Sequence, residues 1–292
     1  MIKKNVLNKS ITILLIAVLF VMAISMLLYR EALNNMACAA VDKEISYSDD
    51  GYSDNGESTL QTETITYSSS KTIAFYRVNN TFPEYYNMNN ALSNACANVA
   101  GANIVGYYDR YYENLIPDYV PGMARGTNYS YYIMAMDSSK KQNLINDLYI
   151  RMNTNVYQAG TSQNDYKNGL TSYINSKGRS ISFSSIMTNS NFDITKLNQA
   201  INNGDPVTLY LSGYNISQVR DDTGSVTISK SIYTGNHMVV VYGYKTIEYY
   251  DSNNVITTSK TYLYIATGMK FTGYYILNNN GAINDAEAVH IS

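Results

Sequence analysis

The sequence predicts an α+β fold, with helices in the first half of the folded region and antiparallel strands in the second half. Two observations lead to this prediction. Apolar residues recur at helical spacing between residues 94 and 204, whereas residues 206 to 277 hold short runs rich in Val, Ile, Thr and Tyr. Because the two patterns occupy separate stretches, we expect a helical lobe packed on an antiparallel sheet lobe.

Four segments carry the helical pattern. In each of them, apolar residues stand three or four positions apart, which places their side chains on one face of a helix. The fourth segment stops at Gly204, and glycine is common just beyond the C-terminus of a helix. The expected helices cover residues 94–113, 144–152, 166–174 and 193–204.

Five segments carry the strand pattern. Turn-forming sequences such as Asp222-Thr-Gly224 and Asn280-Gly281 separate them, as expected for strands joined by hairpins. The expected strands cover residues 206–211, 226–232, 237–247, 260–267 and 273–277.

The N-terminus has the pattern of an export segment. Lys3, Lys4 and Lys9 precede an uncharged apolar run, and the small residues Ala37-Cys38-Ala39 follow it. This order is typical of a cleaved signal peptide over residues 1–40. The run is also long enough for an uncleaved membrane anchor through residues 11–28, and a lipid anchor at Cys38 is a third possibility. All three place the remaining chain in the secreted fraction or on the extracellular face of the membrane.

Residues 41–72 predict a spacer or a pro-segment. This stretch contains seven acidic residues and two lysines, and most of its other residues are Ser, Thr, Gly and Asn. Such a composition has too little apolar surface to form a core. The folded domain is therefore expected to cover residues 73–292.

The charge balance excludes one class of partner. The chain has 21 basic and 23 acidic residues, giving a net charge of -2, with no basic stripe beyond its first residues. Nucleic acid is therefore not expected as a partner. Of the two cysteines, Cys38 lies in the export segment, so a mature chain would carry the single thiol of Cys96.

Cys96 lies near the start of the first expected helix, where Ser93 or Asn94 would cap the chain. A helix N-terminus stabilises a thiolate, the form in which cysteine is a nucleophile. The alternative is that Cys96 is a small buried apolar side chain among alanines.

His237 is the expected partner of Cys96. It opens an apolar strand, where its imidazole would lie at the end of the sheet, although a surface turn is the alternative. Its separation of 141 positions from Cys96 falls within the roughly 130–150 residues of papain-like enzymes. The other histidine, His290, is close to the C-terminus and is expected to be structural.

Three segments together resemble papain-like cysteine peptidases over about residues 82 to 280. The strongest is the histidine strand, Gly235-Asn-His-Met-Val-Val-Val-Tyr-Gly-Tyr244. The helix, turn and strand before it, residues 197–211, are also similar. The helix after Cys96, Ala97-Asn-Val-Ala-Gly-Ala-Asn-Ile-Val-Gly106, resembles the bacteriocin-processing (double-glycine) branch of secreted bacterial proteins.

The resemblance implies a papain-like fold and a thiol peptidase that acts on a peptide or protein substrate without a cofactor. Cys96 would attack the carbonyl and His237 would carry the proton, while Asn90, six residues before Cys96, would donate to the oxyanion. The chain lacks the family's Gly-Ser-Cys-Trp and Asn-Ser-Trp-Gly sequences and any tryptophan. The residue that orients the histidine is therefore open between Thr267, Asn278 and Asp251.

Three other functions remain possible at this point. An inactive domain of the same fold would be a surface binding module, and a cell-wall amidase or endopeptidase would also use Cys and His. A transglutaminase-like enzyme would need an acid after the histidine, for which Asp251 is the only choice. No metal site is expected, because two isolated histidines and one thiol do not form a zinc centre.

Overall fold

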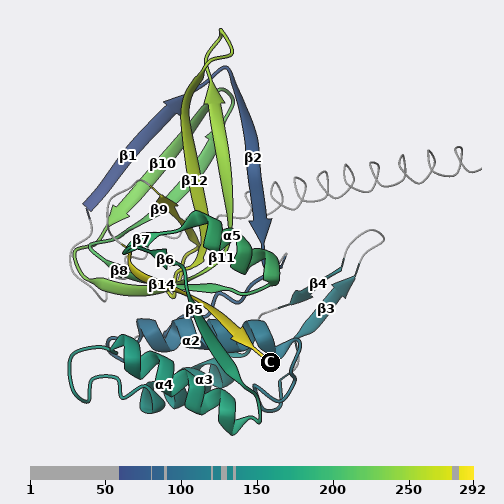
Figure 1. The fold of residues 1–292 in the computed structure, drawn as a ribbon, viewed down its shortest axis with the longest axis vertical. Helices are drawn as coiled ribbons and strands as arrows, with labels where there is room; N and C mark the ends of the chain where they lie inside the picture. The colour runs from purple at the N-terminus through teal and green to yellow at the C-terminus, as the bar shows by residue number, and fades with distance from the viewer. Residues whose placement is uncertain are drawn as a thin grey trace, which may run out of the picture. The chain divides into compact units, whose positions relative to one another are not determined.

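The structure is a computed structural model that describes residues 59–79, 81–88, 91–119, 121–125, 130–133, 136–277 and 283–292 (Figure 1). These residues all belong to one compact unit, Gly51–Ser292. The expected export segment, residues 1–40, lies outside the described residues. Within the part of the chain that is described, no helix is both long and apolar enough to cross a membrane.

A ten-stranded antiparallel sheet dominates the fold, in the order β1-β10-β9-β13-β12-β11-β8-β14-β5, with β2 added on β11. Two short hairpins, β3–β4 and β6–β7, lie outside it. The strands are β1 (Thr59–Thr66), β2 (Ser69–Arg77), β3 (Gly122–Arg125), β4 (Ser130–Ile133), β5 (Ile181–Ser185), β6 (Met187–Thr188), β7 (Asn191–Phe192), β8 (Val207–Ser212), β9 (Asn215–Asp222), β10 (Ser225–Ile232), β11 (Asn236–Tyr250), β12 (Ile256–Ala266), β13 (Gly273–Leu277) and β14 (Ile283–Ile291).

The predicted fold class is wrong. Strands make up 42% of the structure and helices 25%, so it is mostly antiparallel β rather than a papain-like α+β arrangement of two lobes. The elements also do not segregate along the chain, because β1 and β2 precede the first described helix. The strands that the pattern missed are mainly polar. An antiparallel strand with one solvated side has few apolar residues to reveal it.

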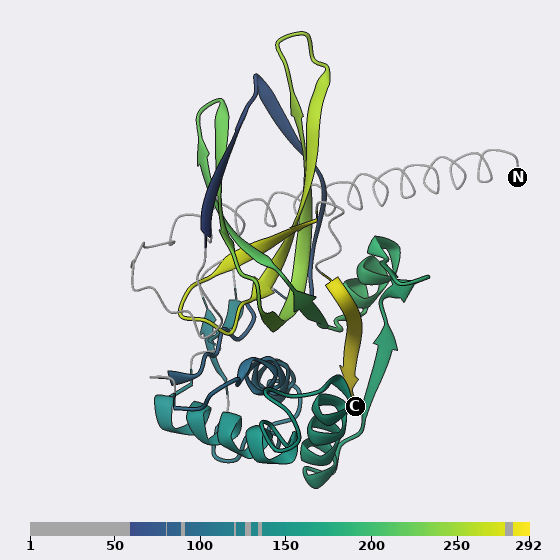
Figure 2. The same ribbon diagram turned by 90° about the vertical axis from the view of Figure 1, so that its left-hand side faces the viewer.

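Residues 59–72, expected as part of a spacer, form β1, the turn at Tyr67 and Ser68, and the start of β2. Each of these strands is antiparallel to a partner, β1 to β10 and β2 to the second half of β11. The turn between them is fixed at both sides, since Tyr67 N–H donates to Gly224 O (2.9 Å) and Ser68 N–H donates to Tyr250 O (2.8 Å). In Figures 1 and 2, β1 and β2 diverge from this turn beside the hairpins β9–β10 and β11–β12.

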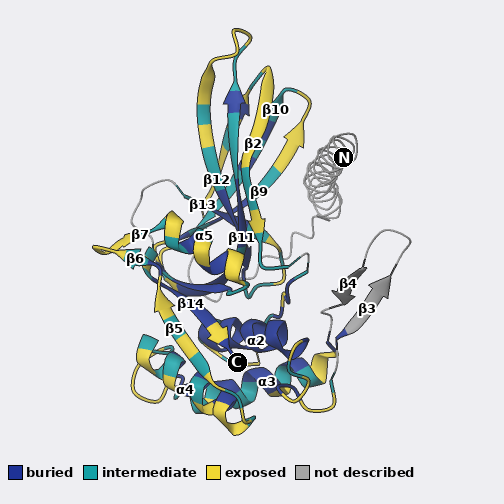
Figure 3. Cartoon of the chain, turned by 45° about the vertical axis from the view of Figure 1, so that its right-hand side comes forward, coloured by how far each residue is buried: buried dark blue, intermediate teal, exposed yellow. Residues whose placement is uncertain are grey.

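The four helices in the described residues lie within or close to the predicted segments. Gly204 adopts the left-handed conformation (φ 85°) at the end of the fourth, as its position predicted. Figure 3 shows that the first helix is buried on all sides, whereas the next two expose their outer faces. The helices are α2 (Cys96–Asp109), α3 (Ser138–Arg151), α4 (Gln163–Ser176) and α5 (Ile194–Asn203).

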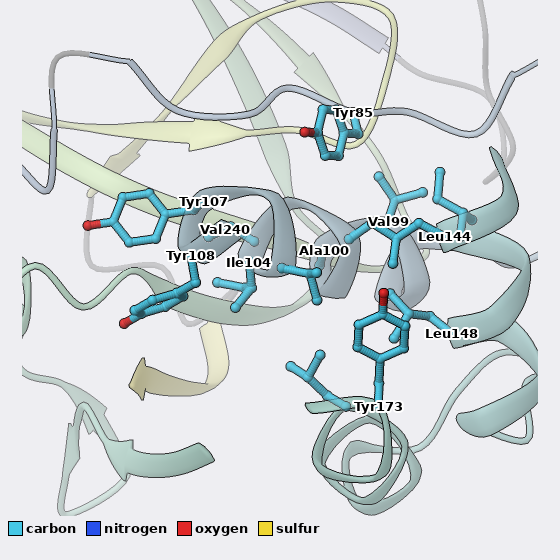
Figure 4. Close-up of a cluster of buried hydrophobic side chains, with 14 of the residues drawn as sticks. Tyr85, Val99, Ala100, Ile104, Tyr107, Tyr108, Leu144, Leu148, Tyr173 and Val240 are labelled. Carbon is cyan, nitrogen blue, oxygen red and sulfur yellow. The ribbon is translucent and has the colours of Figure 1, made fainter. Parts of the chain in front are cut away.

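Helix α2 forms the centre of the largest core cluster (Figure 4). Its residues from Ala97 to Asp109 are all buried. Small residues make this possible, because a Cβ added at Gly106 would lie 2.5 Å from the Tyr85 ring. Val240 of β11 packs on the same cluster as Val99. The helix that begins with Cys96 is therefore held rigidly between the other helices and the sheet.

Candidate active site

Cys96 is the first residue of α2, and its side chain is half-buried. The residue before it, Ala95, is the N-cap and offers no side-chain acceptor to the first turn. Capping by Ser93 or Asn94 is thus not observed. Asn94 turns into the left-handed region (φ 54°), and its amide donates to Asn155 Oδ1 at 2.9 Å. With no side-chain oxygen from the N-cap in place, the positive end of the helix dipole can act on the sulfur.

A buried amide holds the first turn of α2. Asn98 is fully buried, and its Nδ2 donates to Thr154 Oγ1 (2.9 Å) and to Met152 Sδ (3.2 Å), both in the segment that follows α3. Satisfied buried polar groups of this kind specify one position for the backbone. The start of α2, and with it Cys96, is thereby fixed against α3.

His237 lies at the start of β11 and is buried, with 6% of its surface exposed. Its Nε2 is 2.8 Å from the main-chain oxygen of Thr267. Because a carbonyl oxygen only accepts hydrogen bonds, Nε2 carries the proton in this contact. The neutral imidazole then has its lone pair on Nδ1, which is buried and has no hydrogen-bond partner among the described residues.

Burial keeps the imidazole of His237 neutral. It lowers the pKa from 6.5 to about 4, and the hydrogen bond with Thr267 opposes this shift only in part. At neutral pH the side chain is therefore a base with an available lone pair. A buried polar atom without a partner is costly, so it calls for a functional explanation.

The turn Thr267–Gly268 contacts both His237 and helix α2. The Thr267 carbonyl meets His237, as described above. Gly268 (φ 72°) packs on the first turn of α2, where an added Cβ would lie 3.3 Å from Val99 Cγ1. Val99 is one helical turn from Cys96, and Cys96 packs on the same core cluster as Val99. The ring of His237 stacks on Tyr214, which belongs to the neighbouring cluster, so it faces the other side of β11 from Met238. The turn thus contacts His237 directly and α2 through Val99.

Of the two described residues that were considered for orienting His237, Thr267 contacts it, through its main chain. Its hydroxyl is used within the turn, donating to Phe271 O (2.6 Å) and accepting from Met269 N–H (3.1 Å). Asn278, the residue chosen for this role, and Asn90, the expected oxyanion donor, lie outside the described residues.

Asp251 is ruled out as the orienting residue. Its Oδ1 accepts the N–H groups of Asn253 and Val255, each at 2.9 Å, in the turn that joins β11 to β12. Thirteen residues of β11 separate it from His237, which is on the order of 40 Å along an extended strand. Asp251 therefore stabilises a distant turn.

We expect Asp251→Ala to change kcat/KM for a peptide substrate by less than about 2-fold, because the turn is far from the site. The loss of two accepted hydrogen bonds should lower the free energy of unfolding by about 1 kcal/mol. Steady-state kinetics and urea unfolding of the same preparation measure both. A large loss of activity in a variant that remains folded would contradict this assignment.

The structure also places His290 and Tyr214. His290 Nδ1 is 2.7 Å from Asp205 Oδ1 on the surface, which agrees with a structural role. Tyr214, which the sequence did not single out, stacks on the His237 ring with centroids 4.9 Å apart and planes 18° apart. Its position in a turn gives no periodic signal, so only the folded chain reveals it.

Comparisons with protein-family models, with curated proteins and with solved structures find no match for this chain. Within the described residues, no group of three or more His, Cys, Asp or Glu side chains is arranged to hold a metal ion. Function must therefore be inferred from the chemistry of Cys96 and His237 and from the turn that contacts His237 and α2.

Proposed function

We propose that the protein is an exported thiol hydrolase that cleaves peptide bonds through a covalent intermediate on Cys96. The observation that carries the proposal is the Thr267–Gly268 turn, which fixes the imidazole of His237 on one side and contacts the first turn of α2 on the other. The export segment in the sequence supports a location outside the cytoplasm, where the partner would be a peptide or protein substrate.

The first half of the reaction forms an acyl-enzyme. Nδ1 of His237 takes the proton of the Cys96 thiol, and the sulfur attacks the carbonyl carbon of the substrate. The carbonyl oxygen becomes an oxyanion, which the Cys96 N–H at the start of α2 stabilises. The imidazolium then gives its proton to the leaving amine, and the carbon–nitrogen bond breaks.

The second half releases the product and restores the enzyme. His237 takes a proton from water, and the resulting hydroxide attacks the thioester carbon. The carbon–sulfur bond breaks, the acid leaves, and the proton returns to the sulfur. The low pKa of His237 favours the neutral base at the start of both halves.

Thiol reactivity tests the proposal directly. We expect iodoacetamide to label Cys96 at pH 7 at least about 10-fold faster than a small free thiol, because the helix N-terminus favours the thiolate and the neutral imidazole of His237 can accept the thiol proton as the sulfur attacks. Alkylation should abolish peptide hydrolysis at the same rate, whereas a metal chelator should leave hydrolysis unchanged. Stopped-flow labelling with mass spectrometry measures the site and the rate.

Two variants serve as controls for this measurement. Cys38→Ala leaves Cys96 as the only thiol, and His237→Gln retains the thiol but removes the base. Rapid labelling that persists in His237→Gln would contradict the role of His237. Labelling of the unmodified chain at the rate of an ordinary thiol, without peptide hydrolysis, would favour the alternative of a binding module.

A further inference from the structure

Two groups that belong to no recognised catalytic motif hold the imidazole of His237. One is the main-chain carbonyl of Thr267, which meets Nε2 at 2.8 Å. The other is the fully buried ring of Tyr214, stacked nearly parallel on the imidazole. The carbonyl fixes an atom at the edge of the ring, and the tyrosine fixes its plane. Together these two contacts restrict the imidazole to one orientation.

Tyr214 is itself held by a second ring. Tyr233 stacks on it with centroids 4.8 Å apart and planes 14° apart, and Tyr233 N–H donates to Tyr214 O at 2.8 Å. Tyr214 directly precedes β9 and Tyr233 directly follows β10, so both lie where the β9–β10 hairpin begins and ends. The stack of three rings thus connects the imidazole to this hairpin.

The turn at Thr267 makes the carbonyl a fixed acceptor. The Thr267 hydroxyl bridges Phe271 O and Met269 N–H, and Gly268 supplies the left-handed conformation that the turn requires. A carbonyl in such a turn cannot rotate as an asparagine or aspartate side chain can. It also remains an acceptor at every pH, unlike a carboxylate.

We propose that His237 acts through Nδ1 as the Nε2-protonated tautomer, with the Thr267 carbonyl in place of a side-chain third member and Tyr214 as a positioning residue. This inference deepens the function proposed above and rests on it for its kinetic part. The tautomer itself is a property of the folded chain, whether or not the protein is an enzyme.

The tautomer is tested by ¹⁵N NMR of the full chain labelled at histidine, near pH 7. We expect His237 to show a protonated Nε2 and an unprotonated Nδ1, with His290→Gln used to assign its signals. A proton on Nδ1 would overturn the inference and leave the labelling test of Cys96 unaffected. The failure of one proposal is therefore distinguishable from the failure of the other.

The positioning role is tested with Tyr214→Leu against two matched variants. Tyr214→Phe keeps the ring, and Tyr275→Leu removes a buried ring of the same core cluster that lies outside the stack. We expect Tyr214→Leu to lower kcat by roughly 100-fold with little change in KM, since misplacement of a catalytic group by about 1 Å has an effect of this size. Both other variants should retain kcat within about 5-fold.

The inference fails if Tyr214→Leu and Tyr275→Leu lower kcat equally, because a merely structural effect would not distinguish them. It also fails if Tyr214→Leu retains full kcat. If Tyr214→Leu does not fold, the pH dependence of kcat in Tyr214→Phe is measured instead. An acid limb that coincides with that of the unmodified chain supports positioning by the ring, and a displaced limb contradicts it.

Discussion

Replacing Cys96 with serine is expected to lower kcat/KM for peptide hydrolysis by at least about 1000-fold, the loss typical when an acyl-transfer nucleophile is removed. Serine keeps the size and the hydrogen-bonding capacity of cysteine, so α2 should pack as before. Its hydroxyl is far less acidic than a thiol, and a buried imidazole with a low pKa is a weak base toward it. Initial rates on a fluorogenic peptide library, with equal amounts of each protein, measure the effect.

Cys96→Ala and Cys38→Ser complete this comparison. Alanine removes the nucleophile altogether and should match serine within the error of the assay, while the Cys38 variant should retain full activity. Equal unfolding midpoints for all of them would exclude loss of structure as the cause. Hydrolysis that survives in both Cys96 variants would end the proposal of a covalent intermediate on this residue.

The pH dependence of stability should report His237 directly. In the native state burial lowers its pKa to about 4, whereas the unfolded chain titrates at the ordinary value of 6.5. Between these two values the unfolded state binds a proton that the native state does not, so stability increases with pH across this window. This pKa shift corresponds to about 3 kcal/mol in the free energy of unfolding. That contribution is fully present above pH 6.5 and is lost once the pH falls below 4.

Urea unfolding at intervals from pH 4 to pH 7 measures this slope. His237→Gln should flatten it, while His290→Gln, which changes the surface histidine, should leave it in place. The absolute stability of each variant does not enter the comparison, because the pH dependence alone identifies the group. The pH dependence of peptide hydrolysis should reflect the titration of His237. The rate should remain near its maximum at pH 5.5 and fall as the pH approaches 4. A flat stability curve in the unmodified chain would contradict the burial of a neutral imidazole.

The sequence predicted the apolar elements well and the polar ones poorly. The four helices and five strands with periodic apolar faces all form near their expected positions. Strands such as β1 and β9 carry Thr, Ser, Gln and Asp on exposed faces, and β1 pairs with β10, which lies far away in the sequence. Local composition cannot reveal a strand that is stabilised mainly by main-chain hydrogen bonds to distant neighbours. The fold class was wrong for this reason.

The candidate site shows the same division between side chains and main chain. Cys96 and His237 could be singled out as candidates because each has a distinctive chemistry and lies at the start of an element. The Thr267 carbonyl could not, since every residue has a carbonyl and only the turn decides where it points. Asp251 looked suitable because it is acidic and follows His237 in the chain, yet the length of β11 places it at the opposite end of the strand.

The pairing of β1 with β10 limits how this protein could be matured by proteolysis. If residues 41–72 were cut away as one leader, β1 would leave with them and β2 would be shortened at its start. The backbone of β10, now covered by eight residue pairs, would face water as a bare edge that invites aggregation. A processing cut that leaves this edge covered would therefore have to fall before Thr59.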